Sequence, residues 1–214
     1  MTLYVHPAPH THPPAHLASL CIARDRGNVP MVLDMRLGGG LLVAAIAHPE
    51  LRGCPPSLDQ DMLQVGNVGL SLLEQKSHFC LWCLISGPLL ISTDLTQIGD
   101  EALAILKKRE VIAVSQDPLA KQGVRIGPNG SQEVWAKFTV GGMAVVLLNR
   151  ADAGSANVTV SFADLGKPGA APARVRDLYE EKPIGSFAKA FTAIDVPPHG
   201  VVMVNITWEG EGGA

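Results

Sequence analysis

The spacing of hydrophobic and polar positions changes twice along the chain. Residues 1–55 show no regular period. Residues 56–117 carry apolar positions at helical spacing, interrupted by a short continuous apolar run. From 118 to 208, apolar and polar positions alternate, and Gly and Pro separate the alternating segments. The pattern predicts a poorly ordered arm at 1–55, an α/β section at 56–117, an all-β section at 118–208 and a tail at 209–214.

The α/β section begins with a capping box, in which Ser71 is the N-cap and Glu74 follows three residues later. This predicts a helix toward Leu84. Residues 89–92 form a short apolar run that is typical of a buried parallel strand, and a second helix is expected over about 100–108. Strand and helix in alternation are typical of a (β/α) barrel. The side chains expected to be buried on the two helices are Leu72, Leu73, Phe79, Cys80, Cys83, Leu84, Leu103 and Leu106.

The all-β section predicts an antiparallel sandwich. Residues 133–140 and 143–149 alternate on either side of Gly141 and Gly142, which predicts a hairpin. Further strands are expected near residues 158–162, 175–179 and 201–208. Several short strands with turn residues between them are the pattern of a β-sandwich. The fold class is therefore α/β plus all-β: the last βα units of a (β/α)8 barrel followed by an antiparallel β-sandwich.

Composition narrows the range of partners. The chain has 214 residues, of which 47% are apolar and 17% charged, and its net charge is −3. This balance allows a sizeable core and gives no support for nucleic acid or an anionic membrane as a partner. No apolar run reaches the roughly 18–20 residues that span a bilayer. The first sixteen residues lack the charged-then-apolar order of a signal peptide.

Two groups of metal-ligating residue types have plainer interpretations. Four histidines lie in a Pro-broken tract at residues 6–16, where a disordered segment is favoured over a metal site: His6, His10, His12 and His16. Cys80 and Cys83 share a face of the expected helix, so core thiols are favoured over a redox pair, and a zinc site would need more ligands. We expect no metal and no cofactor. Three Asn-x-Ser/Thr sequons, at Asn129, Asn157 and Asn205, hint at a secretory ancestor.

An ordered set of short motifs, which includes Asp59–Leu63, Gln116–Leu119 and Val196–Gly200, resembles the closing section of the α-galactosidases, the retaining glycoside hydrolases of family 27. Asp59-Gln60-Asp61-Met62-Leu63 is similar to the family's Asp-Pro-Asp-Met-Leu, although Gln60 replaces the proline. Gln116-Asp117-Pro118-Leu119 is the strongest single match. The resemblance covers about residues 57–208. Its other motifs are Val65-Gly66-Asn67, Ser77-His78-Phe79, Leu81-Trp82, Pro88–Ile91, Asp94-Leu95, Glu110–Val114, Glu133-Val134-Trp135, Leu147–Arg150, Val175–Leu178 and Val196–Gly200.

The resemblance implies hydrolysis of terminal α-galactosyl residues with retention, by two carboxylates about 5–5.5 Å apart. The family's nucleophile lies in a Lys-x-Asp segment, and none occurs before residue 57. Asp25 is at most a faint counterpart of the acid/base residue. The resemblance further implies a carbohydrate ligand, a homodimer for intact members, and a secreted or lysosomal and vacuolar location.

Carried over residue by residue, the resemblance places Asp61 and Met62 at the edge of the galactose pocket. An ionised carboxylate accepts hydrogen bonds from sugar hydroxyls, and a thioether fills an apolar edge. A loop-capping role is the alternative for Asp61, and Asp59 is less well defined. Asp94 is expected to cap the following helix. We expect His78, Trp82 and Trp135 to be structural, and His199 to belong to a turn.

A complete barrel takes about 250 residues, whereas this chain offers about two βα units. We therefore expect a truncated chain, from a truncated or mis-spliced gene model, that does not cleave glycosides alone. α-N-acetylgalactosaminidase is an equally close match. The alternative from a different class is a non-catalytic accessory or sugar-binding β-sandwich protein.

Overall fold

The computed structural model describes residues 19–24, 30–35, 62–127, 130–169 and 172–208, and side chains from residue 62 onward. Asp59 and Asp61 lie outside these ranges. So do the four histidines of the N-terminal arm, Asp25, Asn129 and the tail at 209–214.

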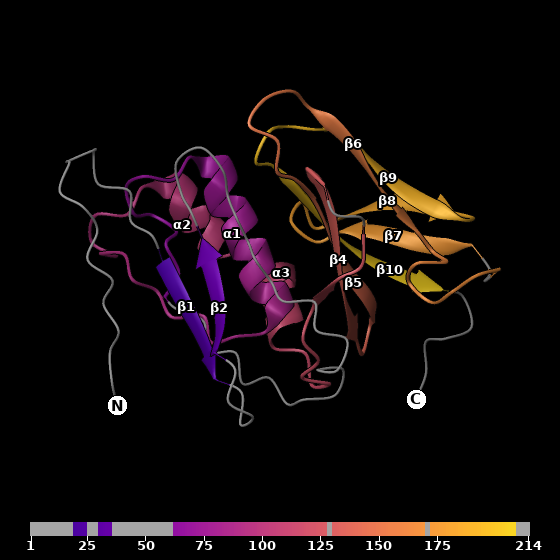
Figure 1. Ribbon diagram of the computed structural model, residues 1–214, viewed down its shortest axis with the longest axis horizontal. Helices are drawn as coiled ribbons and strands as arrows, with labels where there is room; N and C mark the ends of the chain where they lie inside the picture. Colours follow the sequence, from indigo (N-terminus) through magenta and orange to yellow (C-terminus); the bar gives the residue numbers. More distant parts are fainter. Residues whose placement is uncertain (1–18, 25–29, 36–61, 128–129, 170–171, 209–214) are drawn as a thin grey trace.

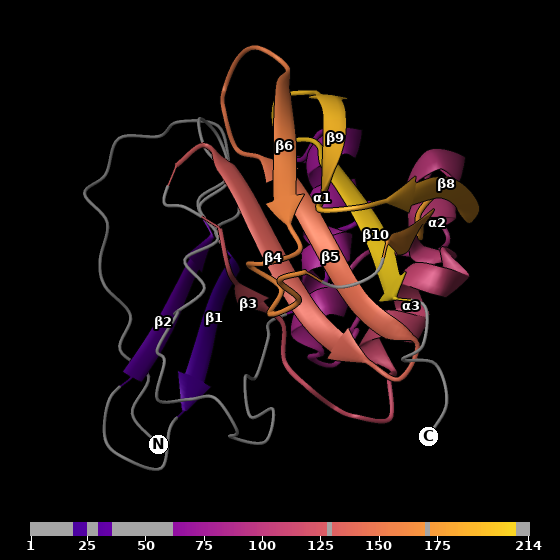
Figure 2. The same ribbon diagram turned by 90° about the vertical axis from the view of Figure 1, so that its right-hand side faces the viewer.

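Three layers make up the described part of the chain from residue 62 onward (Figure 1). Three helices form the first: α1 (Leu72–Ile85), α2 (Asp100–Leu106) and α3 (Arg109–Ser115). A six-stranded sheet in the order β3-β4-β5-β10-β7-β8 forms the second, and the pair β6-β9 forms the third (Figure 2). Their bounds are β3 Val124–Arg125, β4 Gln132–Thr139, β5 Gly142–Asn149, β6 Ala156–Ser161, β7 Ala173–Asp177, β8 Lys182–Phe187, β9 Ala190–Val196 and β10 Val201–Trp208.

The central sheet is buried on both faces, which explains the strand pattern. On β4, Trp135 packs toward the helices, whereas Val134 and Ala136 pack toward β6 and β9. On β5, Val146 packs toward the helices and Leu147 packs toward β6 and β9. Successive side chains on a strand point to opposite faces, so the first core joins the helices to the sheet and the second joins the sheet to the pair β6-β9. The antiparallel sandwich is confirmed.

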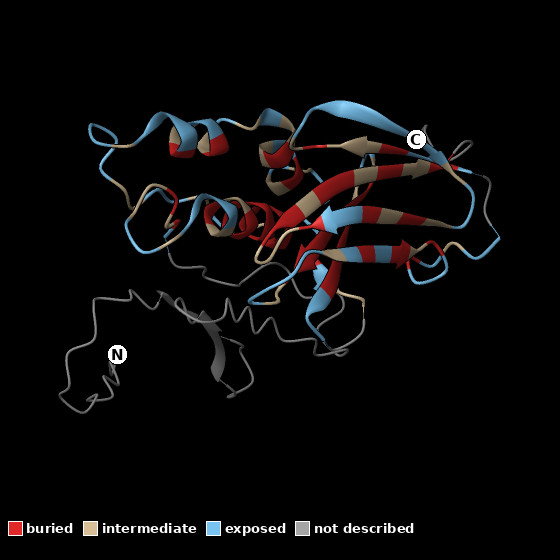
Figure 3. Ribbon diagram, turned by 90° about the horizontal axis from the view of Figure 1, so that it is seen from above, coloured by how far each residue is buried: buried red, intermediate tan, exposed pale blue. Residues whose placement is uncertain are grey.

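Helix α1 begins where the capping box predicts. The Ser71 hydroxyl accepts a hydrogen bond from the Glu74 N–H, and the Glu74 carboxylate accepts one from the Ser71 N–H. From Ser77 to Ile85 every residue is buried (Figure 3). The expected burial of Leu72 and Leu73 is wrong, since they are 41% and 42% exposed. Both lie in the first turn, ahead of the part of the helix that the sheet covers.

The run at 89–92 also differs from its prediction. It is paired in parallel, through a bridge between Leu63 and Ile91, but Leu90 and Ile91 are exposed rather than buried. The second helix ends at Leu106, and a separate helix α3 begins at Arg109. The buried residues of α2 are Ala102 and Ile105, whereas Leu103 and Leu106, which were expected to be buried, are only partly buried.

Strand positions in the sandwich follow the sequence pattern closely. The hairpin β4-β5 turns at the expected glycines, and β10 spans the predicted residues. Strands β8 and β9 were not predicted. In β8, residues 182–186 are exposed and only Phe187 is partly buried, so no alternating pattern marks this strand. An antiparallel hairpin of β1 (Ser19–Arg24) and β2 (Pro30–Met35) lies within the arm that was expected to be poorly ordered. Both strands contain β-branched or large apolar residues, which favour strands.

Within the part of the chain that the structure describes, each helix is too short or too polar to cross a bilayer.

A candidate active-site edge

The candidate site lies where two parallel segments meet, at Leu63 and Ile91. The Leu63 N–H donates to the Leu90 carbonyl (2.6 Å), and the Ser92 N–H donates to the Leu63 carbonyl (3.3 Å). Met62 precedes this bridge and is 40% exposed. The loop at residues 64–70 follows the bridge, so it extends from the carboxyl end of a barrel-type strand, where barrel enzymes carry their sites. Of the two predicted sugar-binding residues, the structure therefore describes Met62, whereas Asp61 lies one residue outside.

Helix α1 holds this loop through two side chains. His78 Nε2 accepts a hydrogen bond from the Gln64 N–H (3.1 Å), and Gln75 Oε1 accepts one from the Gly66 N–H (2.9 Å). The Gln75 side-chain amide also donates to the Leu70 carbonyl (3.0 Å). Each bond satisfies a backbone group that the irregular loop leaves unpaired. The loop is thus fixed to a rigid helix.

The protonation state of His78 suits this role. Its side chain is fully buried, and burial lowers its pKa to about 3. The ring is therefore neutral near pH 7, so the acceptor Nε2 leaves the proton on Nδ1. Nδ1 is buried and has no hydrogen-bond partner, and the ring lies 4.0 Å from the Trp82 ring between centroids. The expectation that His78 and Trp82 are structural agrees with this burial.

The second strand segment holds the loop from the other side. The Asn67 amide donates to the Ser92 hydroxyl (2.7 Å), and that hydroxyl donates to the Leu63 carbonyl (2.6 Å). The same amide donates to the Gln64 side-chain oxygen (2.8 Å). The segment that begins at Met62 is therefore tied to both of its neighbours.

Gly66 is the tightest point of the loop. Its φ is +89°, and a Cβ there would lie 2.9 Å from the Ile98 side chain. We expect Gly66→Ala to lower the free energy of unfolding by about 1–3 kcal/mol, since alanine is strained at positive φ. Urea unfolding measures the change. Gly69→Ala is the matched control, because Gly69 also has positive φ but no atom within 4 Å of an added Cβ; equal losses in the two variants would mean that the Ile98 contact is unimportant.

Asp94 lies near this edge but differs from its prediction. Its carboxylate accepts hydrogen bonds from the Thr96 N–H (2.9 Å) and hydroxyl (2.7 Å), whereas helix α2 has Gly99 as N-cap. Asp94 therefore caps a local turn and not the helix, because the helix cap Gly99 lies five positions further along the chain. The bonds from Thr96 lower the pKa of Asp94, whereas a general acid needs a raised pKa.

The two cysteines whose side chains the structure describes are core residues. Cys80 and Cys83 are free and buried. Burial raises the pKa of Cys80 to about 12 and that of Cys83 well above its usual value. Since the thiolate is the reactive form, this supports the core interpretation over a redox pair.

Sequence reasoning missed two buried charged residues of β4: Glu133, which links neighbouring strands of the sheet, and Lys137, which links the sheet to the helices. Glu133 is fully buried and accepts hydrogen bonds from Arg125 (3.2 Å), Arg150 (2.6 Å) and the Trp135 indole (2.9 Å). The sequence did contain a signal: Glu133 and Lys137 lie two positions before and after the buried Trp135, on the same face of β4. The Lys137 ammonium donates to the Ser86 hydroxyl and the Val114 carbonyl, at the ends of α1 and α3.

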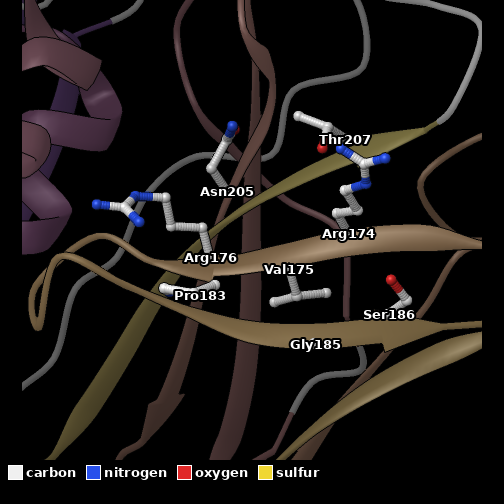
Figure 4. A pocket seen from close by; sticks show the side chains of 8 residues that line it. All are labelled: Arg174, Val175, Arg176, Pro183, Gly185, Ser186, Asn205 and Thr207. Atoms are coloured by element: carbon white, nitrogen blue, oxygen red, sulfur yellow. The ribbon is translucent and has the colours of Figure 1, made fainter.

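A second feature is a groove of about 350 Å³ over β7, β8 and β10 (Figure 4). Asn205 and Thr207 lie on the same face of β10, and Arg174 extends toward Thr207. Arg176 points away and is paired with Glu110 through two hydrogen bonds of 2.8 and 2.5 Å. The groove is lined by Arg174, Val175, Arg176, Pro183, Gly185, Ser186, Asn205 and Thr207.

Comparison with known proteins agrees with this architecture. Residues 47–117 match the model of alpha galactosidase A, and residues 129–206 match the alpha galactosidase C-terminal beta sandwich domain. A probable alpha-galactosidase of Dictyostelium discoideum is 36% identical over 70% of this chain and 40% of its own length. Alpha-N-acetylgalactosaminidase of Gallus gallus is 40% identical over 68% and 36%. The crystal structure of alpha-galactosidase I from Mortierella vinacea superposes with a TM-score of 0.64 at 33% identity, over 69% of this chain and 38% of the other.

These matches place the chain among the glycoside hydrolases that join a (β/α)8 barrel to a C-terminal β-sandwich. Within that class it belongs to the α-galactosidase family, glycoside hydrolase family 27, and corresponds to the C-terminal part of its members. The chain spans about two fifths or less of the length of these relatives. The barrel match begins at residue 47; the domain boundaries at 55 and 117 stay predictions.

Proposed function

We propose that this chain supplies the last βα units and the sandwich of a retaining α-galactosidase, with Asp61 and Met62 at the edge of the sugar pocket. The observation that carries the proposal is the loop at residues 64–70, which is fixed from both sides at the carboxyl end of a barrel-type strand. The substrate is a terminal α-galactoside, and intact members pair as homodimers.

In this proposal the chain binds and orients the sugar. The carboxylate of Asp61 accepts hydrogen bonds from sugar hydroxyls, and the thioether of Met62 covers an apolar edge of the ring. His78 and Gln75 hold the following backbone in place. The two catalytic carboxylates of a retaining glycosidase come from other strands of the barrel.

The purified 214-residue chain is expected to give no turnover of a chromogenic α-galactoside or α-N-acetylgalactosaminide above a blank. It offers two βα units of a fold that takes about 250 residues, and no Lys-x-Asp segment precedes residue 57. Far-UV circular dichroism confirms that the sample is folded, and an intact α-galactosidase serves as positive control. Turnover would mean that residues 1–61 supply the missing nucleophile.

The groove over β7, β8 and β10 favours a second candidate, a sugar-binding sandwich without catalytic activity. Its arginine, amide and hydroxyl groups are hydrogen-bonding partners for a sugar, whereas the lining carries no aromatic platform. Titration with galactose, monitored by the backbone amide chemical shifts of the chain, distinguishes the sugar-binding module from the enzyme part. Saturable shifts at Arg174 and Asn205 would favour the sugar-binding module, and their absence in a folded chain favours the enzyme part.

A further inference from the structure

We propose that Asn157 is an attachment site for an N-linked oligosaccharide, and that Asn205, which lies in the same kind of sequon, is not. Each asparagine is followed two positions later by a threonine, with a residue other than proline between them. This is the pattern that an oligosaccharyltransferase requires, and it does not distinguish the two sites. Their exposure and the hydrogen bonds of their amides do. The inference is independent of the proposed function.

The side chain of Asn157 lies on the outer face of the pair β6-β9, the layer on the far side of the sheet from the helices (Figure 1). Val158 and Val160 are buried in the second core, whereas Asn157 and Thr159 are exposed. Because successive side chains of a strand point to opposite faces, both sequon residues face solvent. A bulky, hydrophilic oligosaccharide belongs on such a surface.

The orientation of the Asn157 amide leaves its nitrogen for the sugar. Asn157 Oδ1 accepts a hydrogen bond from the Asp195 N–H (2.9 Å). The amide is therefore held through its oxygen, whereas N-linked sugars attach to Nδ2. The Thr159 hydroxyl lies 2.9 Å from the Thr192 hydroxyl on the same outer face. The folded strand thus presents the acceptor nitrogen without losing the bond that fixes the side chain.

The strand opposite Asn157 offers a surface for the first sugar. The register of β6 and β9 shifts between Ala156 and Val158, so Asn157 lies opposite Ile194 and Asp195 rather than a single partner. Ile194 is 68% exposed. The C–H groups on the ring face of an N-acetylglucosamine can cover this side chain, and covering apolar surface is favourable.

Asn205 differs in both exposure and hydrogen bonding. It lies on β10, inside the sheet, and pairs with Ala144 of β5 on one side and Arg176 of β7 on the other. Its side chain is only partly exposed, and its Nδ2 donates a hydrogen bond to the Gly141 carbonyl (3.0 Å). A sugar on this nitrogen would compete with that bond and crowd both neighbouring strands. The folded chain therefore favours an unmodified Asn205.

The modification transfers a preassembled oligosaccharide. The donor is an oligosaccharide linked through a diphosphate to a polyprenol lipid. A bond forms between Asn157 Nδ2 and C1 of the terminal N-acetylglucosamine, and the bond between C1 and the diphosphate oxygen breaks. The lipid diphosphate leaves, Nδ2 gives up one proton, and no group is oxidised or reduced.

The test secretes the full 214-residue chain from yeast behind a cleavable leader. Every protein carries Asn129→Gln, because this sequon lies outside the described residues. The mass of the chain is measured before and after treatment with peptide N-glycosidase, in both medium and cell lysate. We expect one glycan, which Asn157→Gln removes completely and Asn205→Gln leaves unchanged. Peptide mass spectrometry should find the aspartate that the glycosidase leaves at position 157.

Two variants of Thr159 form a matched pair in chains that keep Asn157. Thr159→Ser keeps the sequon and a hydroxyl beside Thr192, so the glycan stays, whereas Thr159→Ala destroys the sequon, so the glycan is lost. A glycan that survives Asn157→Gln would overturn the proposal. So would a second glycan that Asn205→Gln removes, or an unmodified chain from cells that glycosylate a co-expressed carrier protein.

Discussion

Replacing Glu133 with alanine is expected to lower the free energy of unfolding by about 3–5 kcal/mol. The fully buried carboxylate serves two arginines and the Trp135 indole. Arg125 and Arg150 have side chains only 23% and 21% exposed. Removing the carboxylate takes a charged acceptor away from two partly buried guanidinium groups and from the Trp135 indole N–H. Urea unfolding monitored by tryptophan fluorescence measures the loss.

Two further variants separate charge from packing. Glu133→Gln keeps the size of the side chain and an acceptor for Trp135, so a smaller loss than in Glu133→Ala is expected. Glu180→Ala removes a carboxylate that is 48% exposed and 3.9 Å from Lys76, and should cost less than about 1 kcal/mol. A loss at Glu133 no greater than that at Glu180 would contradict the importance of the buried group.

Acidification is expected to destabilise the protein through His78. The ordinary pKa of 6.5 falls to about 3 on burial, so the unfolded chain binds a proton below pH 6.5 and the folded chain only near pH 3. The stability that neutral His78 contributes is complete above pH 6.5 and is lost as the pH falls toward 3. At pH 4 the loss is about 3 kcal/mol relative to pH 7.

The His78→Gln variant isolates this contribution. Glutamine does not titrate, and its side-chain oxygen offers an acceptor for the Gln64 N–H. Urea unfolding of both proteins between pH 7 and 4 gives two pH profiles, and their difference removes the contributions of the other titrating groups. Parallel profiles would show that His78 is not the group that loses stability in acid.

Local signals in the sequence predicted the local structure well. The capping box at Ser71 and Glu74 set the start of α1, and Gly141-Gly142 set the β4-β5 hairpin. Such signals depend on neighbouring residues alone. The burial of Leu72, Leu73 and Leu90 depends instead on what covers them, and the apolar pattern carries no information about that.

The candidate site was predictable only in part. The resemblance named the segment that contains Met62, and the structure describes the bonds that hold the loop after it. The roles of His78 and Gln75 could not be derived from sequence, because each acts on a backbone N–H more than eight residues away. Asp61 stays a prediction, since it lies outside the described residues.

The core between the helices and the sheet has a consequence for recombination. It combines Trp82 and Val111 from the barrel part with Trp135 and Met203 from the sandwich, and the Ser77 hydroxyl donates to the His199 carbonyl across the same junction (2.6 Å). A gene fusion that transplanted residues 118–208 alone would expose the sandwich side of this shared interior. The sandwich can therefore be transferred only together with α1 and α3, so an inherited or engineered exchange should cut ahead of Ser71 rather than at residue 117, where the barrel match ends.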